Sequence, residues 1–178
     1  VDGNNLETLM ADCEQIMQVV EQFECGEILF ADDDAQKKRL WKQRRAMGEA
    51  VKAQSIYKEE DTVVPRFKLP ELLAVVKKLG AEYNFQSVCY GHAGDGNLHV
   101  NILRGELSTS DWEKVAIRKL FQEVKKMGGT ISGEHGIGLV QKGFMDIPFS
   151  DIQLNLMKSI KNVFDPKAIL NPGKIFPD

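Results

Sequence analysis

No apolar run in the sequence approaches the roughly 20 residues that a membrane-spanning helix requires. The first residues, VDGNNLETLM, also lack the basic segment followed by an apolar segment that marks a secretory signal peptide. These two absences predict a cytoplasmic protein without a membrane span.

Massed positive charge is absent as well. The chain has 23 Lys and Arg against 26 Asp and Glu, a formal net charge of −3, and the two signs are interspersed. Proteins that bind a phosphate backbone usually concentrate positive charge on one face. We therefore expect no nucleic-acid partner.

Cysteine is scarce, and its spacing follows no motif. Cys13, Cys25 and Cys89 are odd in number and form no Cys-x-x-Cys pair. This pattern favours free, buried thiols in a reducing compartment, with a bridge between Cys13 and Cys25 as the alternative.

Apolar residues make up 43% of the 178 positions, enough for the core of a single domain over residues 1–178. Hydrophobic spacing and helix-start signals predict helices at 6–23, 34–55, 68–83, 111–127, 139–145 and 150–164, and strands at 27–31 and 56–64 followed by a hairpin over 87–103. Because a hairpin is antiparallel, we expect an α+β fold. Its sheet would be ferredoxin-like, covered by helices on one face, with a helical C-terminal extension.

The stretch HAGDGNLH, residues 92–99, has a histidine at each end of a glycine-rich turn. A turn centred between Asp95 and Gly96 would pair His92 with His99, with Cβ atoms about 5 Å apart, close enough for both imidazoles to bind one ion. Side chains alternate along strands, so two sets of residues separate: Tyr90 and Asn101 share the histidine face, and Cys89, Leu98, Val100 and Ile102 form the buried face.

The third histidine, His135, follows Glu134 in a second glycine-rich stretch, GEHGIG. Zinc, manganese and iron sites use imidazole and carboxylate ligands, so Glu134 is the natural third ligand beside His92 and His99. His135 is then free to act as an acid or base near neutral pH. The same residues also fit a metal-dependent hydrolase or a ferredoxin-like module that binds a small ligand, and histidines with this spacing can be incidental.

Three stretches, YGHAGDGNLHVNIL, GGTISGEHGIG and FDPKAILNPGKIF, resemble the signatures of the C-terminal domain of FAD-linked oxidases. This is the group of glycolate oxidase, D-lactate dehydrogenase and D-2-hydroxyglutarate dehydrogenase within the vanillyl-alcohol oxidase superfamily. The resemblance begins at about Glu27 and covers most of the chain. It implies the substrate-binding and catalytic half of a flavin-dependent 2-hydroxy-acid oxidoreductase.

The resemblance also implies residue roles. In metal-containing members, the residues that match His92, His99 and Glu134 bind a divalent metal such as Zn, Mn or Fe. The histidine that matches His135 takes the proton of the substrate hydroxyl, and the asparagine that matches Asn101 contacts the substrate. The hydride on Cα then passes to FAD, which leaves a ketone or an aldehyde.

The substrate carboxylate needs a cation, and the family uses an arginine three residues after a tryptophan. In WKQRR this position is Arg44, with Arg66 and Lys68 of VVPRFKLPE as further candidates. Some dicarboxylate-oxidising relatives use a lysine shortly before this second motif, at a position that matches Glu59 here, with Lys58 only one residue away. This departure argues against 2-hydroxyglutarate and leaves a substrate of the glycolate or D-lactate type.

The tail LNPGK resembles the segment that returns toward the flavin ring, with Asn171 and Lys174 as contacts. Nothing in the sequence resembles the domain that holds the FAD pyrophosphate. We therefore expect an N-terminal FAD-binding domain of a parent chain to hold most of the FAD, and the isolated chain to be inactive. A homodimer and an electron-transfer partner both stay open.

Overall fold

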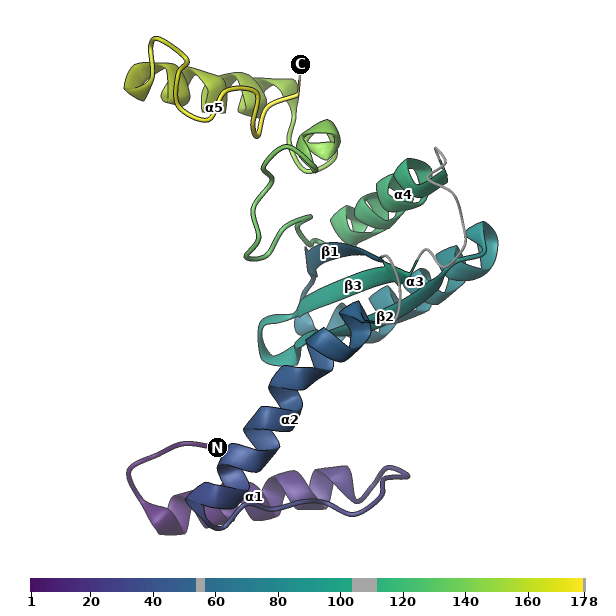
Figure 1. The fold of residues 1–178 in the computed structure, drawn as a ribbon, viewed down its shortest axis with the longest axis vertical. Helices are drawn as coiled ribbons and strands as arrows, with labels where there is room; N and C mark the ends of the chain where they lie inside the picture. The colour runs from purple at the N-terminus through teal and green to yellow at the C-terminus, as the bar shows by residue number, and fades with distance from the viewer. Residues whose placement is uncertain (54–56, 104–111, 178) are drawn as a thin grey trace. The chain divides into compact units, whose positions relative to one another are not determined.

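The computed structural model describes residues 1–53, 57–103 and 112–177 (Figure 1). It divides the chain into two compact units, Val1–Glu49 and Ala50–Asp178. None of the helices within the described ranges is both long and apolar enough to cross a membrane.

The N-terminal unit contains α1 (Leu6–Val20) and most of α2 (Asp34–Lys52). The side chain of Asn5 accepts hydrogen bonds from the N–H groups of Glu7 and Thr8, and that of Asp33 accepts one from Gln36, so both helices begin at a polar cap. Side chains of the two helices line a shared hollow of about 870 Å³, among them Leu6, Leu9, Met10, Cys13, Leu40 and Trp41. No residue of α1 is buried.

The strand predicted at 27–31 is wrong. The segment has no regular structure, and the side chains of Ile28, Leu29 and Phe30 are 38%, 63% and 52% exposed. A strand needs a neighbouring strand to complete its hydrogen bonds, and none of the described strands lies in the N-terminal unit. Local apolar character could not reveal that missing neighbour.

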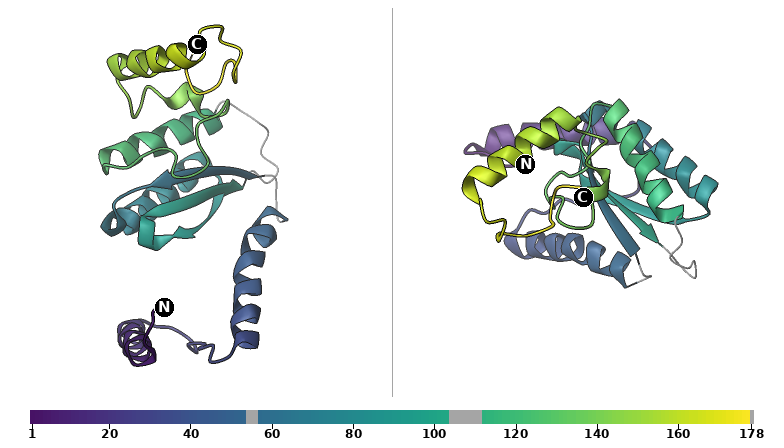
Figure 2. Two further views of the ribbon diagram at one scale, coloured as in Figure 1. Left: turned by 90° about the vertical axis from the view of Figure 1, so that its left-hand side faces the viewer. Right: turned by 90° about the horizontal axis from the view of Figure 1, so that it is seen from above.

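The second unit is built on an antiparallel sheet in the order β1-β3-β2, formed by β1 (Tyr57–Val63), β2 (Gln86–His92) and β3 (Asn97–Leu103). Helix α3 (Leu69–Tyr83) joins β1 to β2, and α4 (Trp112–Lys126) follows β3; both cover the same face of the sheet (Figures 1 and 2). This confirms the α+β prediction. The predicted ends at residues 55, 56 and 111 lie outside the described residues.

A short bridge extends the sheet at the outer edge of β1. Val63 and Thr130 exchange backbone hydrogen bonds of 3.1 and 2.9 Å. In a βαββαβ arrangement the last strand would pair at this edge. The chain that follows α4 therefore runs alongside β1, which brings the second glycine-rich stretch to the sheet.

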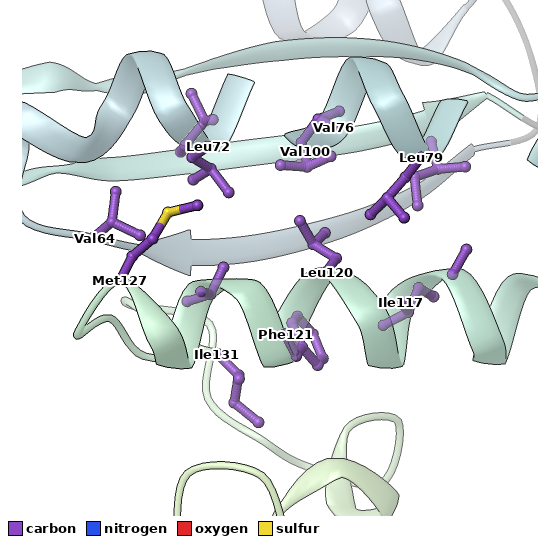
Figure 3. Close-up of a cluster of buried hydrophobic side chains, with 14 of the residues drawn as sticks. Val64, Leu72, Val76, Leu79, Val100, Ile117, Leu120, Phe121, Met127 and Ile131 are labelled. Atoms are coloured by element: carbon purple, nitrogen blue, oxygen red, sulfur yellow. The ribbon is translucent and has the colours of Figure 1, made fainter. Parts of the chain in front are cut away.

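The core lies between the sheet and the two helices (Figure 3). Helical spacing of three and four residues places one apolar stripe of each helix inward. The stripes and the facing residues of β3 are Leu72, Val76 and Leu79; Ile117, Leu120, Phe121 and Val124; and Leu98, Val100 and Ile102. The opposite face of β3 is buried too, and that face carries Asn97, His99 and Asn101.

The predicted direct pairing of His92 with His99 is wrong: His92 pairs with Asn97, and His99 pairs with Tyr90. The connection is a 3₁₀ turn, η2 (Ala93–Asp95), followed by Gly96 at φ 71°, so the hairpin centre lies one residue earlier than predicted. The partner changes by two positions, which leaves every side chain on its predicted face. The two histidines therefore share a face as diagonal neighbours.

The C-terminal extension contains η3 (Lys142–Phe144) and α5 (Asp151–Phe164), which confirms its helical character. The ring of Phe144 meets that of Phe121 edge-on at 5.2 Å, and Arg118 donates hydrogen bonds of 2.7 Å to Asp146 and to the carbonyl of Gly143. These contacts tie the segment after the second glycine-rich stretch to α4.

All three cysteines are free. Cys25 is exposed, so the prediction of a buried thiol is wrong there, whereas Cys89 is half-buried against the core. Burial raises the pKa of the Cys89 thiol to about 11.

We expect Cys89 to resist thiol reagents at a pH of about 8, because the raised pKa leaves little reactive thiolate. Cys25, which is exposed, should be modified first. Time-resolved labelling read by mass spectrometry checks this, with the denatured chain as control, in which all three thiols should react alike. Equal labelling rates for Cys25 and Cys89 in the folded chain would contradict the assignment of Cys89 to the helix-covered face.

Candidate active site

His99 lies at the centre of a polar cluster on the sheet face opposite α3 and α4. His99 is 6% exposed, and its ring lies between two carboxylates. Nδ1 lies 3.0 Å from Oε1 of Glu59 on β1, without hydrogen-bond geometry, and Nε2 lies 3.3 Å from Oε1 of Glu134. One imidazole thus joins a strand to the loop after α4.

Three other rings surround His99. The centre of the His135 ring lies 5.1 Å away, that of Tyr90 lies 5.8 Å away in a stacked arrangement, and that of His92 lies 6.4 Å away, edge-on. Hence all three histidines of the chain meet at one place, although they come from two separate glycine-rich stretches.

Two overlapping groups of three residues could hold a metal ion among the described residues. They are His92, His99 and Glu134, and Glu59, His99 and His135; in each group one ligand atom per residue lies within 4.8 Å of the others. The first group is the ligand set predicted from the sequence. Its outer members are open to solvent, since His92 is exposed and the side chain of Glu134 is 57% exposed.

The loop that carries Glu134 and His135 is attached to β1 through Asp61. Oδ2 of Asp61 accepts hydrogen bonds from the backbone N–H groups of Gly133, Glu134 and His135 at 2.8, 2.7 and 2.8 Å. Oδ1 accepts one from the side-chain amide of Asn97 at 2.8 Å. Three consecutive N–H groups around one oxygen form an anion-binding nest.

The Asp61 carboxylate remains charged in spite of its burial. Desolvation by itself would raise its pKa, but the backbone hydrogen bonds from His135 and Glu134, the amide of Asn97 and the N–H of Gly133 outweigh it and lower the pKa. The residue is only 1% exposed. A buried anion therefore holds the loop in place.

Close packing at Gly133 lets the loop reach the strand. A Cβ atom there would lie 2.2 Å from Nδ2 of Asn97, 2.7 Å from Cγ2 of Val63 and 2.9 Å from Oδ1 of Asp61. Neighbouring atoms would have to shift for any larger residue. Glycine is required here because of close approach rather than because of backbone conformation.

The far end of the same loop is attached to the other face of β1. Glu60 is fully buried on the helix-covered side, and it accepts a hydrogen bond of 2.9 Å from Nε2 of Gln141. Lys58 donates a second of 2.6 Å to the same carboxylate. Two successive residues of β1 thus hold the loop, Asp61 at residues 133–135 and Glu60 at Gln141.

Asn101 is fully buried on the site face, opposite Glu59 in the strand register. Neither Oδ1 nor Nδ2 of its side chain has a hydrogen-bond partner in the part of the chain that the structure describes. Buried amides are nearly always satisfied, so this unused capacity is unusual. The site therefore has unfilled polar contacts beside its histidines.

The residues predicted to bind the substrate carboxylate are divided between the two units of the chain. Arg66 is exposed and lines a hollow of about 570 Å³ with Phe67 and with Asp95 of the hairpin turn. Lys68 pairs with Glu71 at 2.6 Å. Arg44 lies in the N-terminal unit, with its guanidinium carbon 5.8 Å from the ring centre of Trp41.

The two residues predicted to contact the flavin lie in the tail, where Lys174 donates a hydrogen bond of 2.9 Å to the side chain of Asn171. Asn171 has φ 49°, a turn conformation that asparagine tolerates. These hydrogen bonds of Asn171 and Lys174 lie within the tail itself.

Sequence reasoning missed Asp61 and Asn97 altogether and met Glu59 only as a departure from a family pattern. The signal available was the run of acids in YKEEDTVV. Successive side chains of a strand point to opposite faces, so consecutive acids on a strand next to the hairpin must face both sides of the sheet. A carboxylate on a buried face needs several donors, and a glycine-rich loop offers consecutive N–H groups.

An α+β domain with a histidine and carboxylate cluster on its sheet fits the resemblance noted from the sequence. Residues 1–175 match the model of the family described as FAD linked oxidases, C-terminal domain, and the chain belongs to this family.

Three relatives of known name are similar to the chain in sequence. The chain is 39% identical over 178 residues to a protein of Anaerostipes hadrus named D-lactate dehydrogenase, with 98% of this chain and 38% of the relative covered. It is 38% identical over 157 residues to a D-2-hydroxyglutarate dehydrogenase of Stutzerimonas stutzeri, covering 83% and 33%. It is 30% identical over 173 residues to the glycolate oxidase subunit GlcD of Bacillus subtilis, covering 96% and 37%. The chain thus spans about a third of the length of these relatives.

Replacing Gly133 by alanine should lower the free energy of unfolding by about 1–3 kcal/mol, because the added methyl overpacks the loop against Asn97 and Val63. Gly143→Ala is the matched control, since a Cβ atom at Gly143 would meet nothing within 4 Å. Urea denaturation of both variants measures the difference. Equal stability of the two variants would contradict the close approach at Gly133.

Proposed function

We propose that this chain is the substrate-binding and catalytic half of a flavin-dependent 2-hydroxy-acid oxidoreductase. The observation that carries the proposal is the convergence of all three histidines and Glu134 on one sheet face, in a chain of the FAD-linked oxidase family. Relatives named as lactate, hydroxyglutarate and glycolate enzymes support the same reaction class.

His92, His99 and Glu134 would hold a divalent metal of the Zn, Mn or Fe kind. Imidazole and carboxylate donors suit these ions, and the ligand atoms of the three residues already lie within 4.8 Å of one another. The carboxylate of Glu59 lies beside Nδ1, the other ring nitrogen of His99. Metal-binding histidines usually have a carboxylate at this nitrogen, which fixes the orientation of the ring. Bound there, the metal would polarise the hydroxyl and carboxylate oxygens of a 2-hydroxy acid.

His135 would act as the base. It is exposed next to His99 and is not needed in the predicted ligand set, so its imidazole is free to accept the proton of the substrate hydroxyl. FAD, held mainly by an N-terminal FAD-binding domain of the parent chain, would accept the hydride from Cα. The substrate loses one proton to His135 and one hydride, and becomes a 2-oxo acid or, from glycolate, an aldehyde.

Several residues of this chain would orient the substrate and the flavin. Arg66 borders an open hollow near the hairpin turn, and Arg44 offers a second guanidinium for the substrate carboxylate. The unsatisfied amide of Asn101 fits a polar substrate contact. Lys68 is a weaker candidate, because Glu71 already pairs with its charge. Asn171 and Lys174 remain candidates for flavin contact.

The substrate would carry a single carboxylate, as glycolate and D-lactate do. Glu59 adds a carboxylate to the site within 3.0 Å of His99. A second carboxylate on the substrate would be repelled by it, because like charges at close range are unfavourable in a partly buried site. This favours monocarboxylates over 2-hydroxyglutarate.

Replacing His135 by alanine in the flavoprotein that contains this domain should slow FAD reduction by D-lactate or glycolate by about 10² to 10⁴, the usual contribution of a general base. Stopped-flow bleaching of the flavin absorbance under anaerobic conditions measures the rate. The control is an unchanged thermal midpoint and flavin content. If the variant reduced its flavin at the wild-type rate, His135 would not be the base.

Replacing Glu59 by glutamine should raise the ratio of kcat/KM for D-2-hydroxyglutarate over kcat/KM for D-lactate by about tenfold, because a repulsion of roughly 1 to 2 kcal/mol is removed. The ratio cancels any shared loss from the altered His99 environment. Glu123→Gln, a change at an exposed α4 carboxylate that pairs with Lys126, is the control and should leave the ratio unchanged. An unchanged ratio in Glu59→Gln would exclude Glu59 as a specificity determinant.

A further inference from the structure

We infer that Asp61 is a positioning residue, which acts with Asn97 to set the places of Glu134 and His135. Asp61 is not placed to bind the substrate or a metal itself, because both of its oxygens are already used by the loop and by Asn97. The effect of this placement on catalysis rests on the proposed function. The placement itself stands on geometry alone.

Hydrogen bonds fix both carboxylate oxygens of Asp61. One oxygen of Asp61 collects the three N–H groups of residues 133–135, and the other oxygen is fixed by Asn97. A rotation of the carboxylate would break both sets of hydrogen bonds. Asn97 in turn is the strand partner of His92, so the chain of contacts runs from one glycine-rich stretch to the other.

The loop is also closed on itself by a hydrogen bond. Oγ of Ser132 accepts a hydrogen bond of 2.8 Å from the N–H of Gly136, across the residues that Asp61 holds. A displacement of this turn would therefore carry the side chains of Glu134 and His135 together. Catalytic groups misplaced by about 1 Å commonly lose on the order of 10² in rate.

The ends of the loop are fixed without the Asp61 side chain. Thr130 pairs with Val63 through the backbone, and Gln141 is bound by Glu60 on the other face of the sheet. Loss of the Asp61 carboxylate should therefore release Glu134 and His135 while the fold persists, and Gly133 keeps only its backbone hydrogen bond of 3.2 Å to the carbonyl of Asp61. This separates a positioning role from a merely structural one.

Exchanging the side chains of Asp61 and Asn97 between the two positions tests this role. In Asp61→Asn the new amide presents its N–H groups either to the loop donors or to Asn97, whose side chain must then turn its unpartnered Oδ1 toward position 61 to accept. In Asn97→Asp two carboxylates would face each other across the present 2.8 Å contact. The double variant Asp61→Asn/Asn97→Asp restores an acceptor toward the loop and a donor toward position 97.

Two measurements on the 178-residue chain read the result. NMR amide exchange of residues 133–135 reports the loop without any metal, and titration with Zn²⁺ alone reports the site. We expect each single variant to speed exchange and to weaken Zn²⁺ affinity by about tenfold or more, and the double variant to recover most of both. Thr62→Val is the matched control: it removes a buried hydrogen bond of 2.9 Å from the next residue of β1, on the helix-covered face. It should lower the thermal midpoint and change neither readout.

The outcomes are distinguishable. If Asp61→Asn behaved like Thr62→Val in both readouts, or if the double variant were no better than the worse single variant, the positioning role would be overturned. If the wild-type chain bound no Zn²⁺ while the exchange pattern followed expectation, the metal part of the proposed function would fail and the role of Asp61 in placing the loop would stand.

Discussion

The arrangement of the whole site depends on one buried anion, the carboxylate of Asp61. Its desolvation is unfavourable, but three consecutive backbone N–H groups and the amide of Asn97 offset it and keep its pKa low. Through these hydrogen bonds β1 holds a loop that begins far along the chain, after α4. Glu134 and His135 reach His99 because that loop is held there.

The sheet serves two purposes because its central strand is buried on both faces. On one face β3 contributes Val100 and Ile102 to a core closed by α3 and α4. On the other face it presents His99 to two carboxylates. The neighbouring strand β1 repeats this division, with Glu60 directed to the helix-covered side and Asp61 to the site. A rigid scaffold of this kind fixes catalytic groups more firmly than loops alone.

Much of this could be predicted from sequence, wherever a repeating pattern determines the answer. Alternation along a strand put His92, His99 and Asn101 on one face even though the exact partner of His92 was wrong, because a change of two positions preserves the face. The strand expected at 27–31 failed because pairing is not a local property. Asp61 was missed for a similar reason: an acid in a strand resembles a solvated residue until the loop that buries it is known. The family resemblance, which residues 1–175 confirm, supplied roles that spacing alone could not.

We propose that the two glycine-rich stretches and one strand together form a single metal and substrate site. Calorimetric titration of the 178-residue chain with Zn²⁺, compared among wild type, His92→Ala and Glu134→Ala, tests it most directly. We expect one bound ion per chain and a loss of affinity of about tenfold or more in each variant, since the two residues come from different stretches but would share one ion. Absence of binding to the wild-type chain, or binding that either variant left unchanged, would contradict it.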